Sequence, residues 1–222
     1  KDIMTTHQAL IFFIVDPADG TTVHRTISNT QQPYVIAADG GVRVAKYFGV
    51  DIHTVIGDMD SIAPDDYQRL KSAGATFIQH PPQKDFTDLE LALLQAVEKD
   101  ISWMRIIGGI GGRFDQTLAN VYLLALPKLV GRDVGLVAGE QSMRLLYSGV
   151  HHIEGQVGDT LSLIPLGGAV KKIRTDGLQY PLKDETLYFG PARGVSNVFL
   201  SPTVTLHIGA GQLLVIHTNG RA

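Results

Sequence analysis

Hydrophobic positions along the first 140 residues fall into short runs separated by longer polar and amphipathic stretches. We expect the apolar runs to be strands at residues 9–15, 34–38, 54–56, 76–79, 103–107 and 134–137. Strands that alternate with helical stretches are typical of a mostly parallel sheet with helices on its faces. The pattern therefore predicts an α/β fold for this part of the chain.

Local start and stop signals place three of the helices. Pro64 suits a first helical turn and Gly74 follows the expected end of that helix. Thr87 and Glu90 form a capping box that opens an apolar-periodic run to Lys99. A further helix is expected from Asp115 to about residue 125, whereas the polar segment 16–32 is expected to be a loop or hairpin.

The hydrophobic pattern changes after about residue 139. Short β-type runs follow at residues 143–147, 160–164, 187–189, 203–208 and 213–217, separated by glycines and without a helical period. This pattern predicts an antiparallel sandwich or barrel. We therefore expect two domains, an α/β domain at 1–140 and an all-β domain at 141–222.

Composition narrows the classes of function. A net charge of −3 provides no basic field for a nucleic acid or an anionic membrane. The chain has no cysteine, so a bound metal must have oxygen or histidine ligands. No apolar run approaches the roughly 20 residues of a membrane span. We expect a cytoplasmic protein without nucleic-acid or membrane partners.

Acidic residues recur where predicted strands end or helices begin. They are Asp39, Asp58, Asp60, Asp85, Asp88 and Asp115. Because ligands of an open parallel sheet bind beyond the carboxyl ends of its strands, these carboxylates should converge on one crevice. Such a cluster needs a cation, and oxygen ligands suit Mg²⁺ that also contacts substrate phosphates. The pattern thus predicts a Mg–nucleotide site.

A glycine-rich segment, residues 108–112, lies between a predicted strand and a helix. Its backbone N–H groups can approach phosphate oxygens at the helix N-terminus, and Arg113 and Lys84 can add charge-assisted contacts. Each segment alone is more often a plain turn, and Asp88 and Asp115 are as well explained by helix-dipole effects. The inference depends on the segments occurring together.

Taken in order, the segments 38–41, 57–61, 84–90 and 108–116 with Asn120 resemble the motif series of the thiamine pyrophosphokinase family. The resemblance continues at 176–182 and 194–197. It departs from the family at Gln116, where many bacterial members have His. The family implies transfer of pyrophosphate from Mg–ATP to the thiamine hydroxyl, in a homodimer whose active site is shared between subunits.

The resemblance also implies roles for individual residues. Metal binding falls to Asp58, Asp60 and Asp88, and either Asp85 or Asp115 orients or deprotonates the hydroxyl. Thiamine binding is expected at Gln116, Ser196 and Asn197. ATP binding is expected at Asp39, Gly40, Gly41, Lys84, Gly109, Gly111, Gly112, Arg113 and Asn120.

Three other functions remain open from the residues. A pyrophosphokinase acting on a hydroxymethylpterin would use a similar acidic and glycine-rich core. A non-catalytic nucleotide or thiamine sensor would need a pocket but not this full set of carboxylates. A metal-dependent hydrolase would release phosphate or pyrophosphate without an alcohol acceptor, so the dependence of AMP formation on thiamine separates it from a transferase.

Overall fold

The computed structural model describes residues 7–13, 17–83 and 85–221, and the chain divides into two compact units. The first unit is Lys1–Gly139 and the second is Glu140–Ala222. Within the described part of the chain, no helix is both long enough and apolar enough to cross a membrane.

Among the described residues of the first unit, six parallel strands form a sheet in the order β6-β5-β1-β2-β3-β4. They are β1 (Gln8–Phe12), β2 (Tyr34–Ala38), β3 (Thr54–Gly57), β4 (Thr76–Gln79), β5 (Trp103–Ile107) and β6 (Asp133–Ala138). The predicted parallel α/β architecture is confirmed, although the predicted first strand extends into residues 14–15, which lie outside the described residues.

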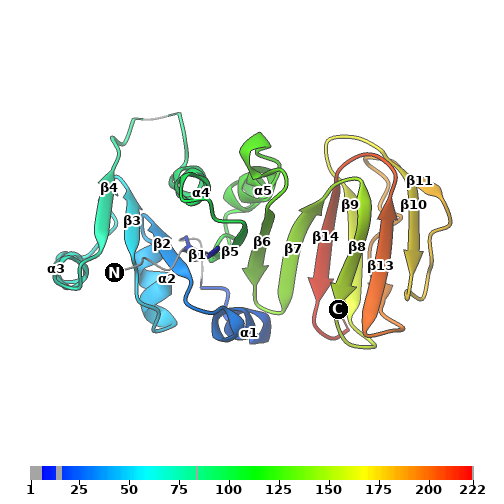
Figure 1. Ribbon diagram of the computed structural model, residues 1–222, viewed down its shortest axis with the longest axis horizontal. Helices are drawn as coiled ribbons and strands as arrows, with labels where there is room; N and C mark the ends of the chain where they lie inside the picture. Colours follow the sequence, from blue (N-terminus) through cyan, green and yellow to red (C-terminus); the bar gives the residue numbers. More distant parts are fainter. Residues whose placement is uncertain (1–6, 14–16, 84, 222) are drawn as a thin grey trace. The chain divides into compact units, whose positions relative to one another are not determined.

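Five α-helices and one 3₁₀ turn connect the described strands. They are α1 (Thr21–Asn29), α2 (Gly41–Tyr47), α3 (Pro64–Ser72), α4 (Asp88–Glu98), α5 (Phe114–Leu123) and η1 (Pro127–Leu129). The chain reverses its direction across the sheet after β4, so right-handed crossovers place α4 and α5 on the face opposite α1 and α2. Figure 1 shows these two helix layers. The reversal lies between β1 and β5, where ligands of such sheets bind.

Two of the predicted helix starts are confirmed by their local chemistry. Pro64 occupies the first turn of α3, where its missing N–H costs no hydrogen bond. The Thr87 side chain accepts a hydrogen bond from the Glu90 N–H at 3.2 Å and caps α4. The capping box thus fixes Asp88 as the first residue of α4.

The prediction of a loop or hairpin at residues 16–32 is wrong, because α1 covers most of the described part of that segment. Gly20 precedes α1 without a side-chain cap, and only Val23 is fully buried. The helix start is held by tertiary contacts: the Thr22 N–H donates to the Gly139 carbonyl, and the Gly139 N–H donates to that of Ala18. Long-range packing on β6 therefore replaces the local signal.

The second unit is built from two antiparallel sheets of four strands each, in the orders β12-β9-β14-β7 and β11-β10-β13-β8. The strands are β7 (Gln141–Leu146), β8 (Gly149–Glu154), β9 (Thr160–Pro165), β10 (Val170–Asp176), β11 (Glu185–Leu187), β12 (Asn197–Val198), β13 (Thr203–Ile208) and β14 (Leu213–Thr218). Side chains from both sheets, including Leu163, Ile173 and Leu206, share one core. The predicted all-β sandwich is confirmed.

The buried carboxylate of Asp159 lies near the C-terminal strand of this sandwich. Asp159 is 4% exposed, and one of its oxygens accepts hydrogen bonds from the Gln156 N–H and from a ring nitrogen of His217, both at 2.8 Å. The other oxygen accepts from the Gly220 N–H at 2.7 Å. Burial raises the pKa of Asp159, but these three donors outweigh it and hold the pKa below its usual value.

Candidate active site

Three carboxylates meet beyond the carboxyl ends of β2 and β3. Asp39 follows β2, while Asp58 and Asp60 follow β3. One oxygen from each lies within 4.8 Å of the others, so the three form a group that could hold a metal ion. Asp39 and Asp58 are half-buried and Asp60 is exposed. The structure thus brings together the residues of two separate sequence motifs, as parallel strand ends require.

Asp39 is the most constrained member of this group. Its backbone has φ of 45°, and its N–H donates to the Ile56 carbonyl at 2.8 Å. Oδ2 accepts a hydrogen bond from Ser61 Oγ at 2.6 Å. Oδ1 is buried and has no hydrogen-bond partner among the described residues. A buried carboxylate oxygen without a donor is costly, which is a reason to expect a cation beside it.

A fourth carboxylate, that of Asp88, lies next to Gly57 and close to Asp39. A Cβ placed on Gly57 would lie 3.1 Å from Asp88 Oδ1 and 3.2 Å from Asp39 Cβ. Asp39 and Asp88 therefore both lie against the end of β3, at a residue that has no side chain. The φ of Gly57 is 143°, a conformation that L side chains rarely adopt.

A cavity of about 280 Å³ opens beside these carboxylates. Its walls come from the strand ends, the loop before α4 and one face of α5. The lining residues are Phe13, Asp58, Pro82, Phe86, Thr87, Asp88, Gln116, Ala119 and Asn120. Asp85 is exposed and is not part of this lining. Gln116, assigned above to thiamine, thus lines the cavity next to the acidic group.

The glycine-rich loop between β5 and α5 is held by two side chains of α5. Asn120 is 4% exposed, and its Nδ2 donates to the Gly109 carbonyl at 2.7 Å. Thr117 Oγ1 lies 3.2 Å from both the N–H and the carbonyl oxygen of Gly111. A Cβ on Gly112 would meet no atom within 4 Å. Asn120 and Thr117 therefore fix the loop, while Gly112 borders open space.

Arg113 and Asp115, at the start of α5, form an ion pair with each other. Arg113 Nε donates to Asp115 Oδ1 at 3.1 Å, and its Nη2 bonds the other carboxylate oxygen. The arginine lowers the pKa of Asp115, with a smaller contribution from the Gln116 N–H. Asp115 is thus engaged by Arg113 in this structure, and Lys84 lies outside the described residues.

Gly40 and Gly41 lead from Asp39 into α2, and packing explains Gly41. A Cβ on Gly41 would lie 2.0 Å from the Phe12 carbonyl oxygen of β1, so no side chain fits there. The Gly40 carbonyl accepts a hydrogen bond from the Arg43 N–H in the first turn of the helix. The two glycines thus let α2 begin close against β1, which sets the position of Asp39.

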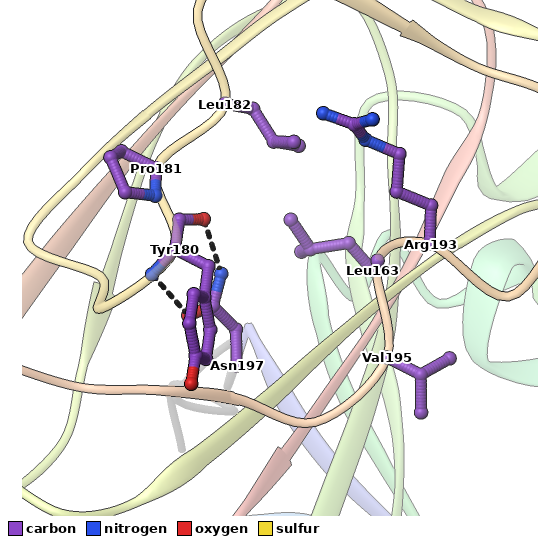
Figure 2. A pocket seen from close by; sticks show the side chains of 8 residues that line it. Leu163, Tyr180, Pro181, Leu182, Arg193, Val195 and Asn197 are labelled. Carbon is purple, nitrogen blue, oxygen red and sulfur yellow. Dashed lines mark hydrogen bonds between the residues drawn. The ribbon is translucent and has the colours of Figure 1, made fainter.

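The second unit has a pocket of its own, of about 220 Å³. Its lining consists of Leu163, Tyr180, Pro181, Leu182, Arg193, Gly194, Val195 and Asn197. Figure 2 shows Asn197 bonded to both polar atoms of the Tyr180 backbone. Its Oδ1 accepts from the Tyr180 N–H at 3.0 Å, and its Nδ2 donates to the Tyr180 carbonyl at 2.7 Å.

The two residues assigned to thiamine in this unit differ in their surroundings. Asn197 is 7% exposed, and its side chain is used to hold the pocket wall. Ser196 is exposed, and its backbone N–H donates to Ser162 Oγ at 3.1 Å with φ of 59°. Arg193, which also lines the pocket, pairs with Glu185.

Sequence reasoning missed the residues that hold these groups in place. Gly57 and Ser61 lie inside the motif at 57–61 and Thr117 directly follows the motif at 108–116, but the sequence assigns no role to these three residues. Their partners lie far away in sequence or across a turn. The spacing of Thr117 and Asn120 on one helix face was the available signal for the loop contacts. Tyr180 lies in the segment 176–182 that resembles the family but had no individual role, and Arg193 lies just outside the segment 194–197.

Comparisons with known proteins agree with this arrangement. A family model described as "Thiamin pyrophosphokinase, catalytic domain" matches residues 26–133. A second, described as "Thiamin pyrophosphokinase, vitamin B1 binding domain", matches residues 150–213. The first match includes the acidic group and the glycine-rich loop, and the second includes the pocket of the second unit.

Individual relatives extend the match over most of the chain. Thiamine pyrophosphokinase of Bacillus subtilis is 27% identical over 184 residues, 82% of this chain and 86% of the relative. The crystal structure of that name from the same organism has a TM-score of 0.82 at 25% identity, covering 96% of this chain and 99% of the other. A thiamin pyrophosphokinase family protein of Enterococcus faecalis has a TM-score of 0.83 at 25% identity, covering 96% and 100%. The chain therefore belongs to the thiamine pyrophosphokinase family of enzymes.

Proposed function

We propose that this chain carries out the reaction for which its family is named, transferring pyrophosphate from Mg–ATP to the hydroxyl of thiamine and releasing AMP. The observation that carries the proposal is the acidic group of Asp39, Asp58, Asp60 and Asp88 at the ends of β2 and β3 and the start of α4. A sensor would not need four carboxylates gathered beside a cavity that two of them, Asp58 and Asp88, line.

The acidic group fits a magnesium ion by its donor chemistry. All its ligand atoms are carboxylate oxygens, and Asp39 Oδ1 is buried without a partner among the described residues. Asp58, Asp60 and Asp88 would hold the ion, with Asp39 beside them. A bound Mg²⁺ supplies positive charge that offsets the charge developing on the transferred phosphates.

The nucleotide phosphates are assigned to the loop of residues 108–112 and the N-terminus of α5. Backbone N–H groups at a helix start favour anions, and Gly112 leaves space for close approach. Asn120 keeps the loop in place through Gly109. Arg113 lies at the same helix start and supplies a guanidinium that can bond phosphate oxygens in place of Asp115.

The proton of the attacking hydroxyl needs an acceptor or free access to water. Asp115 is a weak candidate, because both its oxygens bond Arg113 and its pKa is lowered. We therefore assign Asp115 to orienting Arg113. Of the two residues considered from the sequence, Asp85 remains the candidate acceptor, since it is exposed in the loop before α4.

Thiamine is assigned to the second unit, which the vitamin B1 binding model matches. The pocket there combines apolar walls from Leu163 and Leu182 with the exposed ring of Tyr180. Asn197 shapes the pocket by fixing the Tyr180 backbone, and Ser196 offers an exposed hydroxyl. We assign Gln116, in the first unit, to the nucleotide phosphates rather than to thiamine, because it lines the same cavity as Asp58 and Asp88.

An acceptor comparison tests this function. AMP release from Mg–ATP is measured with thiamine, with a hydroxymethylpterin and with no acceptor, and the products are identified by mass spectrometry. AMP that forms only with thiamine supports the proposal. Transfer to the pterin would keep the chemistry but change the substrate, and AMP release without any acceptor would indicate a hydrolase. The comparisons with known proteins do not favour these alternatives.

A homodimer with an active site shared between subunits and a cytoplasmic location remain predictions. Sedimentation equilibrium of the purified protein tests whether it is a dimer. Mixing Asp60→Asn protein with an Asn197→Ala variant tests the sharing, because a mixed dimer would regain activity if one subunit supplies the acidic group and its partner the thiamine pocket.

A further inference from the structure

Ser61 stands between two carboxylates of the acidic group. Its Oγ lies 2.6 Å from Asp39 Oδ2 and 3.1 Å from Asp60 Oδ1. A serine hydroxyl has a single hydrogen, so it can donate to only one carboxylate at a time. The shorter distance identifies Asp39 as the acceptor, with Asp60 next to the same hydroxyl.

This contact decides which oxygen of Asp39 is left for a cation. Ser61 occupies Oδ2, whereas Oδ1 is buried and has no partner among the described residues. Along the same segment, the Asp60 N–H donates to Asp58 Oδ1 at 3.2 Å. Two donors of one turn therefore hold two of the carboxylates, Asp39 through Oδ2 and Asp58 through Oδ1, with the Asp60 carboxylate next to the Ser61 hydroxyl.

We propose that Ser61 is a positioning residue, which holds Asp39, next to Asp60, in the arrangement that binds the metal ion before the nucleotide arrives. The inference rests on the proposed function, because the ion is that of the proposed reaction. Carboxylate ligands are oriented by hydrogen bonds from neighbouring groups, and loss of such a partner typically lowers metal affinity about 10- to 100-fold. Ser61 itself needs no contact with substrate.

A purely structural role for Ser61 makes a different prediction. The helix that follows, α3, is capped at Ala63 without a side-chain hydrogen bond, so Ser61 does not cap it. Removing the hydroxyl should therefore change metal binding more than it changes folding. A serine that only stabilised the turn would show the reverse.

The test is a titration with Mn²⁺ alone, followed by the electron paramagnetic resonance signal of the free ion. Wild type is compared with Ser61→Ala, Ser61→Thr and Asp58→Asn, and with Ser72→Ala as a control at an exposed serine of α3. We expect Ser61→Ala to weaken Mn²⁺ binding about tenfold or more. Ser61→Thr, which keeps the hydroxyl, should restore most of the affinity, and Ser72→Ala should match wild type.

Turnover gives a second readout. In Ser61→Ala the Mg²⁺ concentration for half-maximal activity should rise about tenfold, while kcat at saturating Mg²⁺ stays near that of wild type. If Asp58→Asn loses Mn²⁺ binding but Ser61→Ala does not, the proposed role of Ser61 is wrong and the metal site itself still stands. Unchanged binding in Asp58→Asn, or no saturable binding in wild type, would overturn the metal site and the role of Ser61 with it.

Discussion

Substitution of Gly57 by alanine probes how closely the carboxylates must be held. The residue has φ of 143°, so an alanine there is strained by about 1–3 kcal/mol. Its Cβ would also lie 3.1 Å from Asp88 Oδ1 and 3.2 Å from Asp39 Cβ, closer than the roughly 3.5–4.0 Å of normal contact. Both acidic residues must then move apart by several tenths of an ångström.

The expected effects on stability and on activity can be separated. Strain of about 1–3 kcal/mol lowers Tm by about 2–4 °C for each kcal/mol in a chain of this size. Catalytic groups must stay within about 0.5 Å of their working positions, and a misplacement of about 1 Å can reduce the rate about 100-fold. A shift of several tenths of an ångström is smaller than this, so we expect kcat/KM to fall about tenfold, equivalent to about 1.4 kcal/mol.

Gly74→Ala is the matched control. Gly74 has φ of 87°, and a Cβ there would meet no atom within 4 Å. It should lose stability through backbone strain, without any change in kcat/KM. Thermal unfolding and steady-state kinetics of the two variants make the comparison. A Gly57→Ala protein with kcat/KM within threefold of wild type would refute the argument that this glycine sets the carboxylate spacing.

Three other substitutions test separate parts of the account. Asp60→Asn and Asp88→Asn should each abolish turnover while circular dichroism shows an intact fold, and near-normal kcat in both would contradict their assignment to the metal. Asn197→Ala should lower the free energy of unfolding by about 1–3 kcal/mol, because it leaves the Tyr180 backbone groups unpaired. Urea unfolding measures this loss, and an increased KM for thiamine with unchanged KM for ATP should accompany it. Asp159 has a lowered pKa in the folded state, so its contribution to stability is present above its unfolded pKa of about 3.9 and is lost as pH falls through the folded value. Urea unfolding between pH 7 and 3 should therefore show a steeper acid loss in wild type than in Asp159→Asn, and equal slopes would contradict this.

The parts of the fold that were predictable from sequence are those with local signals. The alternating apolar runs predicted the parallel strands. Thr87 predicted the start of α4, because its side chain caps the helix through a hydrogen bond to a residue only three positions away. Helix α1 lacked such a signal, since Gly20 makes no side-chain cap and the start depends on Gly139. The spacing of Val23 and Ile27 was the one amphipathic feature available.

The acidic residues of the site could be predicted from the sequence, but the hydrogen bonds that hold the site residues in place could not. Carboxylates at the carboxyl ends of neighbouring parallel strands lie at the same edge of the sheet. The sequence pattern therefore predicted that Asp39, Asp58 and Asp60 lie close together. It could not show that Ser61 bonds Asp39, because that contact joins two separate loops. Nor could it show that the Asn197 side chain is used within the pocket wall, since its partner Tyr180 lies in another loop.

The most direct test of the central claim is the stoichiometry of products formed from Mg–ATP and thiamine, followed by phosphorus NMR. The account predicts that wild type forms AMP and thiamine diphosphate in equal amounts, and that Asp60→Asn forms neither. ADP with thiamine monophosphate, or free pyrophosphate with AMP and unchanged thiamine, would contradict the transfer of pyrophosphate to the thiamine hydroxyl.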